Sequence, residues 1–250
     1  MNTIIEVKNL SKNFNKTQVL DDISFRVERG EFIAIMGQSG SGKSTLLYNI
    51  SGMDRPSFGE VNLCGIETVK LSDDKLSRVR LTQMGFVFQQ SYLLKNLSLQ
   101  DNIVLPGFQA GSSSREQVNQ RAMELMSKTG IDQVGDHDIK KVSGGQLQRA
   151  AICRALINQP EILFADEPTG ALNSSTTKEI MNIFNRINSE GTTIIMVTHD
   201  AKVAARASRV IYLVDGKLHD ELKLGAFQPE EDEIANRERR LYDWLEQQGF

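Results

Sequence analysis

The 250-residue chain has few cysteines and no long apolar run. Its two cysteines, Cys64 and Cys153, lie far apart and lack the spacing of metal ligands, which argues against a disulfide framework or a zinc site. We interpret both as small core residues of a protein in a reducing cytosol. No segment reaches the roughly 18 consecutive apolar residues of a membrane-spanning helix, and the N-terminus lacks a signal-peptide pattern. We therefore expect a chain that does not cross a membrane by itself, while docking onto a membrane protein stays open.

The sequence also lacks an excess of basic residues. The formal net charge is −3 and the sequence pI is about 5.7. Because affinity for a nucleic-acid backbone comes mainly from lysine and arginine, this balance argues against a nucleic-acid partner. Hydrophobic residues make up 40% of the chain and charged residues 24%, as in an ordinary globular protein, and the length suits one large domain or two small ones.

A glycine-rich stretch at residues 37–44 matches the phosphate-loop pattern G-x-x-x-x-G-K-[ST]. The apolar residues 31–36 before it predict a buried strand, and residues 45–50 after it predict a helix. In such a loop the backbone N–H groups point into one concavity, Lys43 brings a charge to the outer phosphates and Ser44 offers a hydroxyl to Mg²⁺. A Gly/Ser-rich turn without a ligand is the disfavoured alternative, because both flanking elements are in place. The predicted binding residues are Gly37, Gln38, Ser39, Gly40, Ser41, Gly42, Lys43, Ser44 and Thr45.

The other patterns predict an α/β fold around this loop. Period-2 alternation in residues 4–7 and 23–27 indicates an antiparallel β layer, with Phe14 in a turn between them and near the nucleotide. Apolar strands alternate with helical patterns after residue 143, which predicts a parallel core sheet with crossover helices. Residues 91–142 are mostly helix-forming and predict an inserted α-helical subdomain.

These boundaries give three predicted parts. The core takes residues 1–90 and 143–225, the helical subdomain residues 91–142, and a C-terminal helical extension residues 226–250. The extension has a helical pattern with four apolar residues roughly on one side, Ile234, Leu241, Trp244 and Leu245. Packing of this helix onto the body is the favoured interpretation, and docking of a partner is the alternative.

Two acidic residues, Asp166 and Glu167, follow the apolar residues 162–165. The carboxyl end of a strand in an α/β sheet faces the ligand crevice. In a phosphate-loop protein a carboxylate there completes the Mg²⁺ shell with the loop serine, and the next one can polarise a water toward the γ-phosphate. Without other motifs, two adjacent acidic residues at a strand end are equally typical of a solvent-exposed turn. Together with residues 37–44 they predict a metal ligand and a catalytic base.

A second anion-binding helix start is predicted at Ser143, Gly144, Gly145 and Gln146. A plain N-cap turn is the alternative. Because one nucleotide needs one phosphate cradle, a second cradle indicates a nucleotide held by another subunit. Gln89 and His199 each follow a predicted strand, so we expect both in the crevice, with His199 contacting the γ-phosphate rather than serving as a plain surface residue.

With these motifs assembled, residues 4–222 resemble an ATP-binding subunit of ABC transporters. The family's motifs occur in order: the Walker A loop at residues 37–44, the Q-loop glutamine at Gln89, the signature at residues 143–146, Walker B at residues 162–166, the catalytic carboxylate at Glu167, the D-loop at residues 170–173 and the switch histidine at His199. The resemblance implies a P-loop ATPase that uses ATP and Mg²⁺. It also implies catalytic roles for Lys43, Gln89, Glu167 and His199, metal contacts from Ser44, Gln89 and Asp166, and stacking of Phe14 on adenine.

Three positions depart from the family's usual residues. Phe14 replaces a tyrosine and can still stack on adenine. Val142 replaces a leucine, which is a mild change. Asn173 stands where the D-loop usually has aspartate, so a segment expected to cross a dimer interface loses a charge.

Finer resemblances point to a branch of the family. Residues 86–89, 93–97 and 101–106 are similar to macrolide-export, lipoprotein-release and cell-division ATPases. Residues 165–172 and 195–200 most resemble the bacitracin- and lantibiotic-resistance transporters of Gram-positive bacteria. Resistance to antimicrobial peptides is therefore the expected role, and a lipoprotein-releasing or cell-division complex is the alternative.

The resemblance also implies partners and a location. Two copies should clamp two ATP molecules head to tail, beneath a membrane permease at the cytoplasmic face of the membrane. Residues 90–106 are the candidate docking surface for that permease. A soluble ABC-type ATPase acting on DNA or ribosomes is a weaker alternative, because a long coiled coil, a second ATPase half and a basic charge are all missing.

Overall fold

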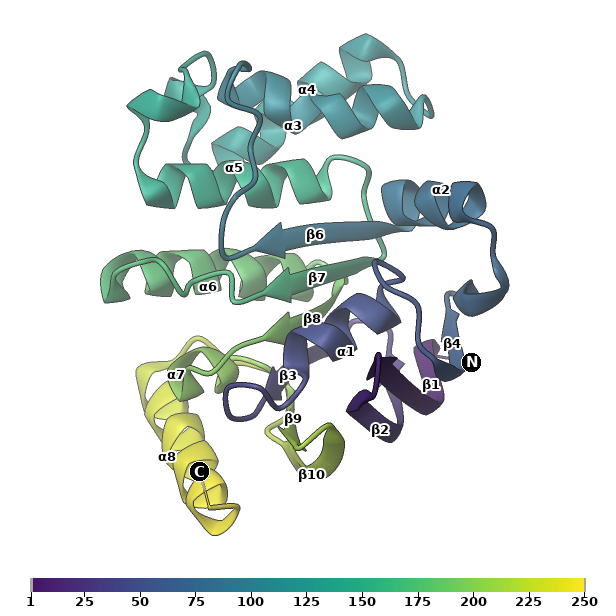
Figure 1. The fold of residues 1–250 in the computed structure, drawn as a ribbon. Coiled ribbons are helices and arrows are strands. Elements are labelled where there is room, and N and C mark those ends of the chain that lie inside the picture. The colour runs from purple at the N-terminus through teal and green to yellow at the C-terminus, as the bar shows by residue number, and fades with distance from the viewer. Residues whose placement is uncertain (1, 250) are drawn as a thin grey trace. The chain divides into compact units, whose positions relative to one another are not determined.

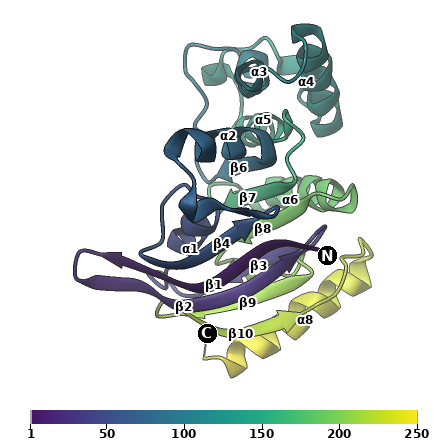
Figure 2. The same ribbon diagram turned by 90° about the vertical axis from the view of Figure 1, so that its right-hand side faces the viewer.

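A computed structural model describes residues 2–249, apart from the side chains of residues 231 and 232 (Figures 1 and 2). The described chain divides into two compact units. The first unit takes the chain up to residue 76 and again from residue 187, and the second takes residues 77–186. No helix in residues 2–249 combines the length and apolar character needed to cross a bilayer.

The antiparallel layer of the first unit is built on one long hairpin. Strands β1 (Thr3–Phe14) and β2 (Thr17–Glu28) pair with each other, and β4 (Phe58–Leu63) and β5 (Ile66–Glu67) extend the sheet in the order β2-β1-β4-β5. The pairing runs well beyond the stretches that alternation indicated, because register shifts interrupt the pattern without ending the strands. Asn9 and Asp22, at two successive register shifts, have left-handed backbones, and the Asn9 side-chain amide donates to the Asp22 carboxylate at 2.8 Å.

The parallel strands of the first unit carry the phosphate-loop segment. Strand β3 (Phe32–Met36) pairs in parallel with both β8 (Thr193–Val197) and β9 (Arg209–Val214), and β10 (Lys217–Lys223) returns antiparallel to β9. Every residue of β3 and β8 is buried, which explains their unbroken apolar sequences. Helix α1 (Lys43–Ile50) follows β3 as expected, and α7 (Ala201–Ala204) follows β8. With only one turn, α7 has too few residues to show helical periodicity and was not predicted.

The second unit contains a parallel strand pair and the helical segment. Strands β6 (Met84–Phe88) and β7 (Ile162–Asp166) pair in parallel. Helices α3 (Leu99–Ala110), α4 (Arg115–Thr129) and α5 (Gly144–Leu156) lie within this unit, while α2 (Asp73–Gln83) and α6 (Ser174–Ser189) run across its chain boundaries. Short 3₁₀ turns cover Thr68–Lys70, Asp132–Val134 and Ile139–Lys141. Ser114 is the N-cap of α4 and forms a reciprocal capping box with Gln117.

The C-terminal helix α8 (Glu231–Gln247) packs onto the first unit, beside α7 and β10 (Figures 1 and 2). Leu241, Trp244 and Leu245 are buried, as the helical pattern predicted, and Ile234 is partly exposed. The Trp244 indole donates to the Asp220 carboxylate at 3.0 Å. The helix therefore packs onto the first unit, which is the interpretation that its sequence favoured.

Arg237, in the middle of α8, is completely buried. Its guanidinium donates hydrogen bonds to five backbone carbonyls in the segments after α7 and β10, those of Ala205, Ala207, Leu224, Gly225 and Ala226. The Phe227 ring lies 5.6 Å from it, and the Glu233 carboxylate forms an ion pair at 3.6 Å. Burial lowers the pKa of Arg237, although an arginine with these donors stays charged. A charged side chain thus fastens the helix at its centre, where the sequence indicated only apolar contacts.

Cys153 should be unreactive in the folded protein. It is buried in α5, its Sγ lies 3.2 Å from the Thr129 hydroxyl, and burial raises the pKa of its thiol to about 12. Cys64 is partly exposed. At ~pH 8 we expect a disulfide reagent to modify Cys64 alone in the native state, and both thiols in denaturant. Rapid modification of a native Cys64→Ser variant would contradict this expectation.

Candidate functional site

The phosphate-loop residues adopt the strand–loop–helix arrangement that their sequence predicted. Strand β3 ends at Met36 and α1 begins at Lys43, with six residues between them. A Cβ on Gly37 would lie 2.2 Å from the carbonyl oxygen of Leu213, so the loop can pass this close to β9 only with glycine. Gly42 has a φ of 98° immediately before the helix, a conformation that strains other residues.

Lys43 turns back over its own loop. Its ammonium donates to the carbonyl oxygens of Gly37 at 2.9 Å and Gln38 at 2.8 Å, and the residue is only 8% exposed. The positive charge is therefore held against the loop instead of extending into solvent. Within the described chain the buried Ser41 hydroxyl has no hydrogen-bond partner. A buried hydroxyl without a partner fits a loop whose polar groups are completed by an anionic ligand.

His199 leaves the sheet at the same edge as the phosphate loop. Strands β3 and β8 run parallel with Ile35 opposite Val197, and the Thr198 N–H donates to the Ile35 carbonyl at 3.2 Å. The next residue, His199, is exposed, and Asp200 then caps α7. The pairing register thus brings the start of the loop and His199 to one end of neighbouring strands.

Phe14 ends β1 and is 49% exposed. The Lys12 ammonium lies 4.8 Å from the centroid of its ring, and the same ammonium contacts the Asp54 carboxylate at 2.7 Å and the Arg55 carbonyl at 2.7 Å. Lys12 therefore links the aromatic ring to the chain shortly after α1. Nothing in the sequence around Lys12 indicated this contact, because it joins residues that are far apart along the chain.

In the second unit, Gln89 and Glu167 come together. Strands β6 and β7 end side by side with Phe88 opposite Asp166, so both residues follow adjacent strand ends. The Gly170 N–H donates to the Glu167 carbonyl at 3.1 Å. A Cβ on Gly170 would lie 2.9 Å from Gln89 Nε2 and 3.3 Å from Glu167 Oε2, so these side chains meet beside this glycine. Glu167 has a φ of 47°, a left-handed conformation that is uncommon for glutamate and typical of functional positions.

The residues at 143–146 form the start of α5. Ser143 is the N-cap: its hydroxyl accepts from the Gln146 N–H at 3.3 Å, and the Gln146 side chain accepts from the Ser143 N–H at 2.8 Å. Gly144 lies at the helix start and is exposed. A Cβ on Gly145 would come within 2.8 Å of Thr176, so this glycine allows α5 to approach the beginning of α6. Ser143 is therefore an N-cap, as the alternative interpretation held. The helix start is also exposed, so an anion could still approach it.

The sequence-predicted site residues belong to both units. Phe14, residues 37–45 and His199 lie in the first, and Gln89, residues 143–146, Asp166 and Glu167 lie in the second. Among residues 2–249, no cluster of three or more histidine, cysteine or acidic side chains could hold a metal ion. A magnesium ion would therefore depend on single hydroxyl, amide and carboxylate oxygens, which are donors that Mg²⁺ accepts.

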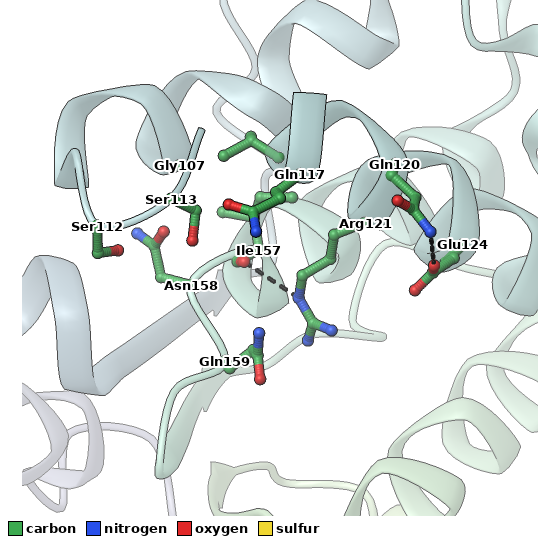
Figure 3. A pocket seen from close by; sticks show the side chains of 11 residues that line it. Gly107, Ser112, Ser113, Gln117, Gln120, Arg121, Glu124, Ile157, Asn158 and Gln159 are labelled. Carbon is green, nitrogen blue, oxygen red and sulfur yellow. Dashed lines mark hydrogen bonds between the residues drawn. The ribbon is translucent and has the colours of Figure 1, made fainter. Parts of the chain in front are cut away.

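A cavity of about 320 Å³ opens between α3, α4 and the segment after α5 (Figure 3). Arg121 crosses it and donates to the carbonyl oxygens of Leu156 and Ile157, each at 3.1 Å. The Gln120 side chain donates to the Glu124 carboxylate at 3.2 Å. Because no predicted site residue lines this cavity and Arg121 serves the end of α5, we assign the cavity no part in nucleotide binding.

Comparison with known proteins identifies relatives over most of the chain. The family model described as ABC transporter matches residues 20–170. A macrolide export ATP-binding/permease protein, MacB, of Aggregatibacter actinomycetemcomitans is 45% identical over 219 residues, or 86% of this chain and 34% of MacB. MacB of Neisseria meningitidis serogroup B is 43% identical over 220 residues, with the same two shares. The chain thus spans about a third of the length of these curated relatives.

A solved structure matches over its whole length. The dimeric structure of MJ0796, a bacterial ABC transporter cassette, gives a TM-score of 0.82 and 41% identity over 90% of this chain and 100% of that one. A second dimeric structure of that cassette, in a post-hydrolysis state with ADP and Pi, gives 0.82 and 40%. The predicted mixed fold, with parallel and antiparallel sheets and a helical segment, is confirmed by these matches.

Proposed function

Because this chain belongs to the ABC transporter family and is an ATPase of that family, we propose that it powers a membrane permease. The observation that carries the proposal is the phosphate loop, with the Lys43 ammonium held at its carbonyls and the partnerless Ser41 hydroxyl buried within it. Both groups suit a ligand with several negative oxygens. A nucleoside triphosphate has that chemistry.

In the proposed reaction, a water attacks the γ-phosphate of ATP in line with the departing ADP oxygen. Glu167 accepts the proton of that water and His199 contacts the γ-phosphate. Lys43 offsets the negative charge that develops on the transferred group. The left-handed backbone at Glu167 supports this assignment, since it directs the carboxylate to where the Gln89 amide also lies.

A bound magnesium ion would supply positive charge that offsets part of the negative charge of the phosphate groups. Ser44, Gln89 and Asp166 are the residues that would hold it. All three offer oxygen donors, as this ion prefers. Phe14 would stack on adenine through its exposed ring.

We also propose that two copies of the chain share two ATP molecules. Each site would take residues 37–45 from one copy and residues 143–146 from the other. The exposed start of α5 supports this arrangement, because its backbone N–H groups offer a second place where phosphate oxygens could bind. The MJ0796 cassette, all of which matches 90% of this chain, is itself described as dimeric.

The permease is proposed to dock on residues 90–106 at the cytoplasmic face of the membrane. Three large apolar side chains of this stretch are exposed, Tyr92, Leu94 and Leu105. Scattered exposed apolar residues are common, but three within one short segment suit a contact with another protein. The relatives named MacB are ATP-binding/permease proteins, which is consistent with such a partner.

The transported molecule is proposed to be an antimicrobial peptide of the bacitracin or lantibiotic type. The names of the MacB relatives favour macrolide export as a second candidate. The full-length gene product should be expressed together with any membrane protein encoded by a neighbouring gene, in a host sensitive to both drug classes. Increased resistance to bacitracin, without a change for erythromycin, is the expected result.

The Lys43→Ala variant of the same pair is the control, because it removes the ammonium from the loop. It should return the host to full sensitivity. Resistance to erythromycin alone would replace the peptide assignment with macrolide export. An unchanged response to both drugs would argue against a role in resistance and favour the lipoprotein-release or cell-division alternative.

A further inference from the structure

Gln148 lies in the second turn of α5, close after the proposed signature residues, and is only 3% exposed. A primary amide in such a place must find partners for its two N–H groups. Gln148 Nε2 donates to the Phe88 carbonyl at 2.9 Å and to the Pro168 carbonyl at 2.7 Å. One side chain therefore joins α5 to the ends of two different strand segments.

The two carbonyls flank the residues proposed for catalysis. Phe88 directly precedes Gln89, and Pro168 directly follows Glu167. The pairing of β6 with β7 extends to Phe88 opposite Asp166. Beyond that pair Glu167 is left-handed and Pro168 has no N–H, so regular parallel pairing cannot continue. The Gln148 amide supplies the donors at the point where the sheet stops doing so.

We propose that Gln148 is a positioning residue for ATP hydrolysis, holding the Gln89 and Glu167 segments at a fixed separation and tying both to α5. This inference rests on the proposed role of Glu167 as the base. The nearby contacts agree with it: Gln89 and Glu167 meet beside Gly170, so a shift of either backbone changes their relation directly. Gln148 itself donates only to backbone carbonyls in the described contacts and takes no chemical part.

The test compares two amides that make the same kind of bridge. Gln148→Met keeps the length and burial of the side chain while removing both donors. Asn158, just after α5, donates to the Leu81 carbonyl at 2.8 Å and the Pro106 carbonyl at 3.1 Å, so Asn158→Leu removes an equivalent pair away from the proposed site. ATP turnover by the purified full chain gives kcat and KM, and urea unfolding gives stability.

We expect Gln148→Met to lower kcat by about 10- to 100-fold with KM for ATP within about threefold, since small misplacements of catalytic groups cost up to about 100-fold. Asn158→Leu should leave both constants within about threefold, although it removes as many hydrogen bonds. Gln148→Leu also lacks both donors and carries no charge, so it should show the same selective loss of kcat. Unchanged kcat in either folded Gln148 variant, or an equal loss in Asn158→Leu, would overturn the inference.

Glu167→Gln, measured in the same assay, separates this inference from the proposed function. Normal turnover in Glu167→Gln would remove the proposed base, and with it the premise for Gln148. Loss of turnover in Glu167→Gln together with normal turnover in Gln148→Met would overturn only the positioning role.

Discussion

Replacing Glu167 by glutamine should reduce ATP turnover by at least about 100-fold while ATP binding is retained. A positioned general base contributes about 10²- to 10⁴-fold, and the amide of glutamine cannot accept the proton of the attacking water. The substitution keeps the size of the side chain beside Gln89 and Gly170, so the local packing should persist. Phosphate release measures turnover, and a fluorescent ATP analogue measures binding. Because hydrolysis is blocked, ATP should also trap the proposed dimer, which size-exclusion chromatography detects.

Two further variants serve as controls for Glu167→Gln. Glu116→Gln changes an exposed glutamate in the first turn of α4 and should leave turnover within about twofold, as a surface substitution away from the site. Lys43→Ala should lose binding and turnover together, because it removes the charge held at the phosphate loop. Near-normal turnover in Glu167→Gln would exclude Glu167 as the base.

Replacing Arg237 by methionine should lower the free energy of unfolding by about 3 kcal/mol. Five backbone carbonyls lose a charged donor, and each buried carbonyl left without a partner costs about 1–3 kcal/mol. Methionine avoids the cost of burying a charge, which offsets part of this loss. Urea denaturation monitored by fluorescence of the single tryptophan, Trp244 in the same helix, reports the effect directly.

Arg240→Met is the matched control for that measurement. Arg240 lies in the same helix but is exposed, and its guanidinium donates to the Lys223 carbonyl at 3.3 Å. Its replacement should change stability by no more than about 0.5 kcal/mol. Equal effects of the two substitutions would show that Arg237 does not fasten α8.

The sequence predicted the elements whose pattern is local and regular. Strand β3 and helix α1 lie within about two residues of the stretches predicted on either side of the phosphate loop, because an apolar run and a helical pattern are visible without tertiary information. The hairpin of β1 and β2 was predicted too short, since the register shifts at Asn9 and at Asp22 break the alternation on which the prediction depended. Helix α7 escaped prediction because one turn has no period.

The residues of the candidate site likewise differ in how far the sequence could predict them. Residues 37–44 are contiguous, so their loop could be derived from composition and flanking elements. Arg237 and Gln148 could not be recognised, because their partners are backbone carbonyls in distant segments. In the sequence Arg237 lies within a charged run that reads as a helix surface, and only the tertiary fold shows that its side chain points inward. The catalytic roles of the motif residues remain predictions.

The left-handed backbone at Glu167 places local stability and the proposed catalytic role in conflict. Glycine and asparagine tolerate a φ of 47° with less strain than glutamate does, so either would suit the local conformation better. Neither could replace the proposed base. If Glu167 is the base, selection for thermal stability alone would therefore favour substitutions here that remove it, and selection for ATP hydrolysis would retain the glutamate.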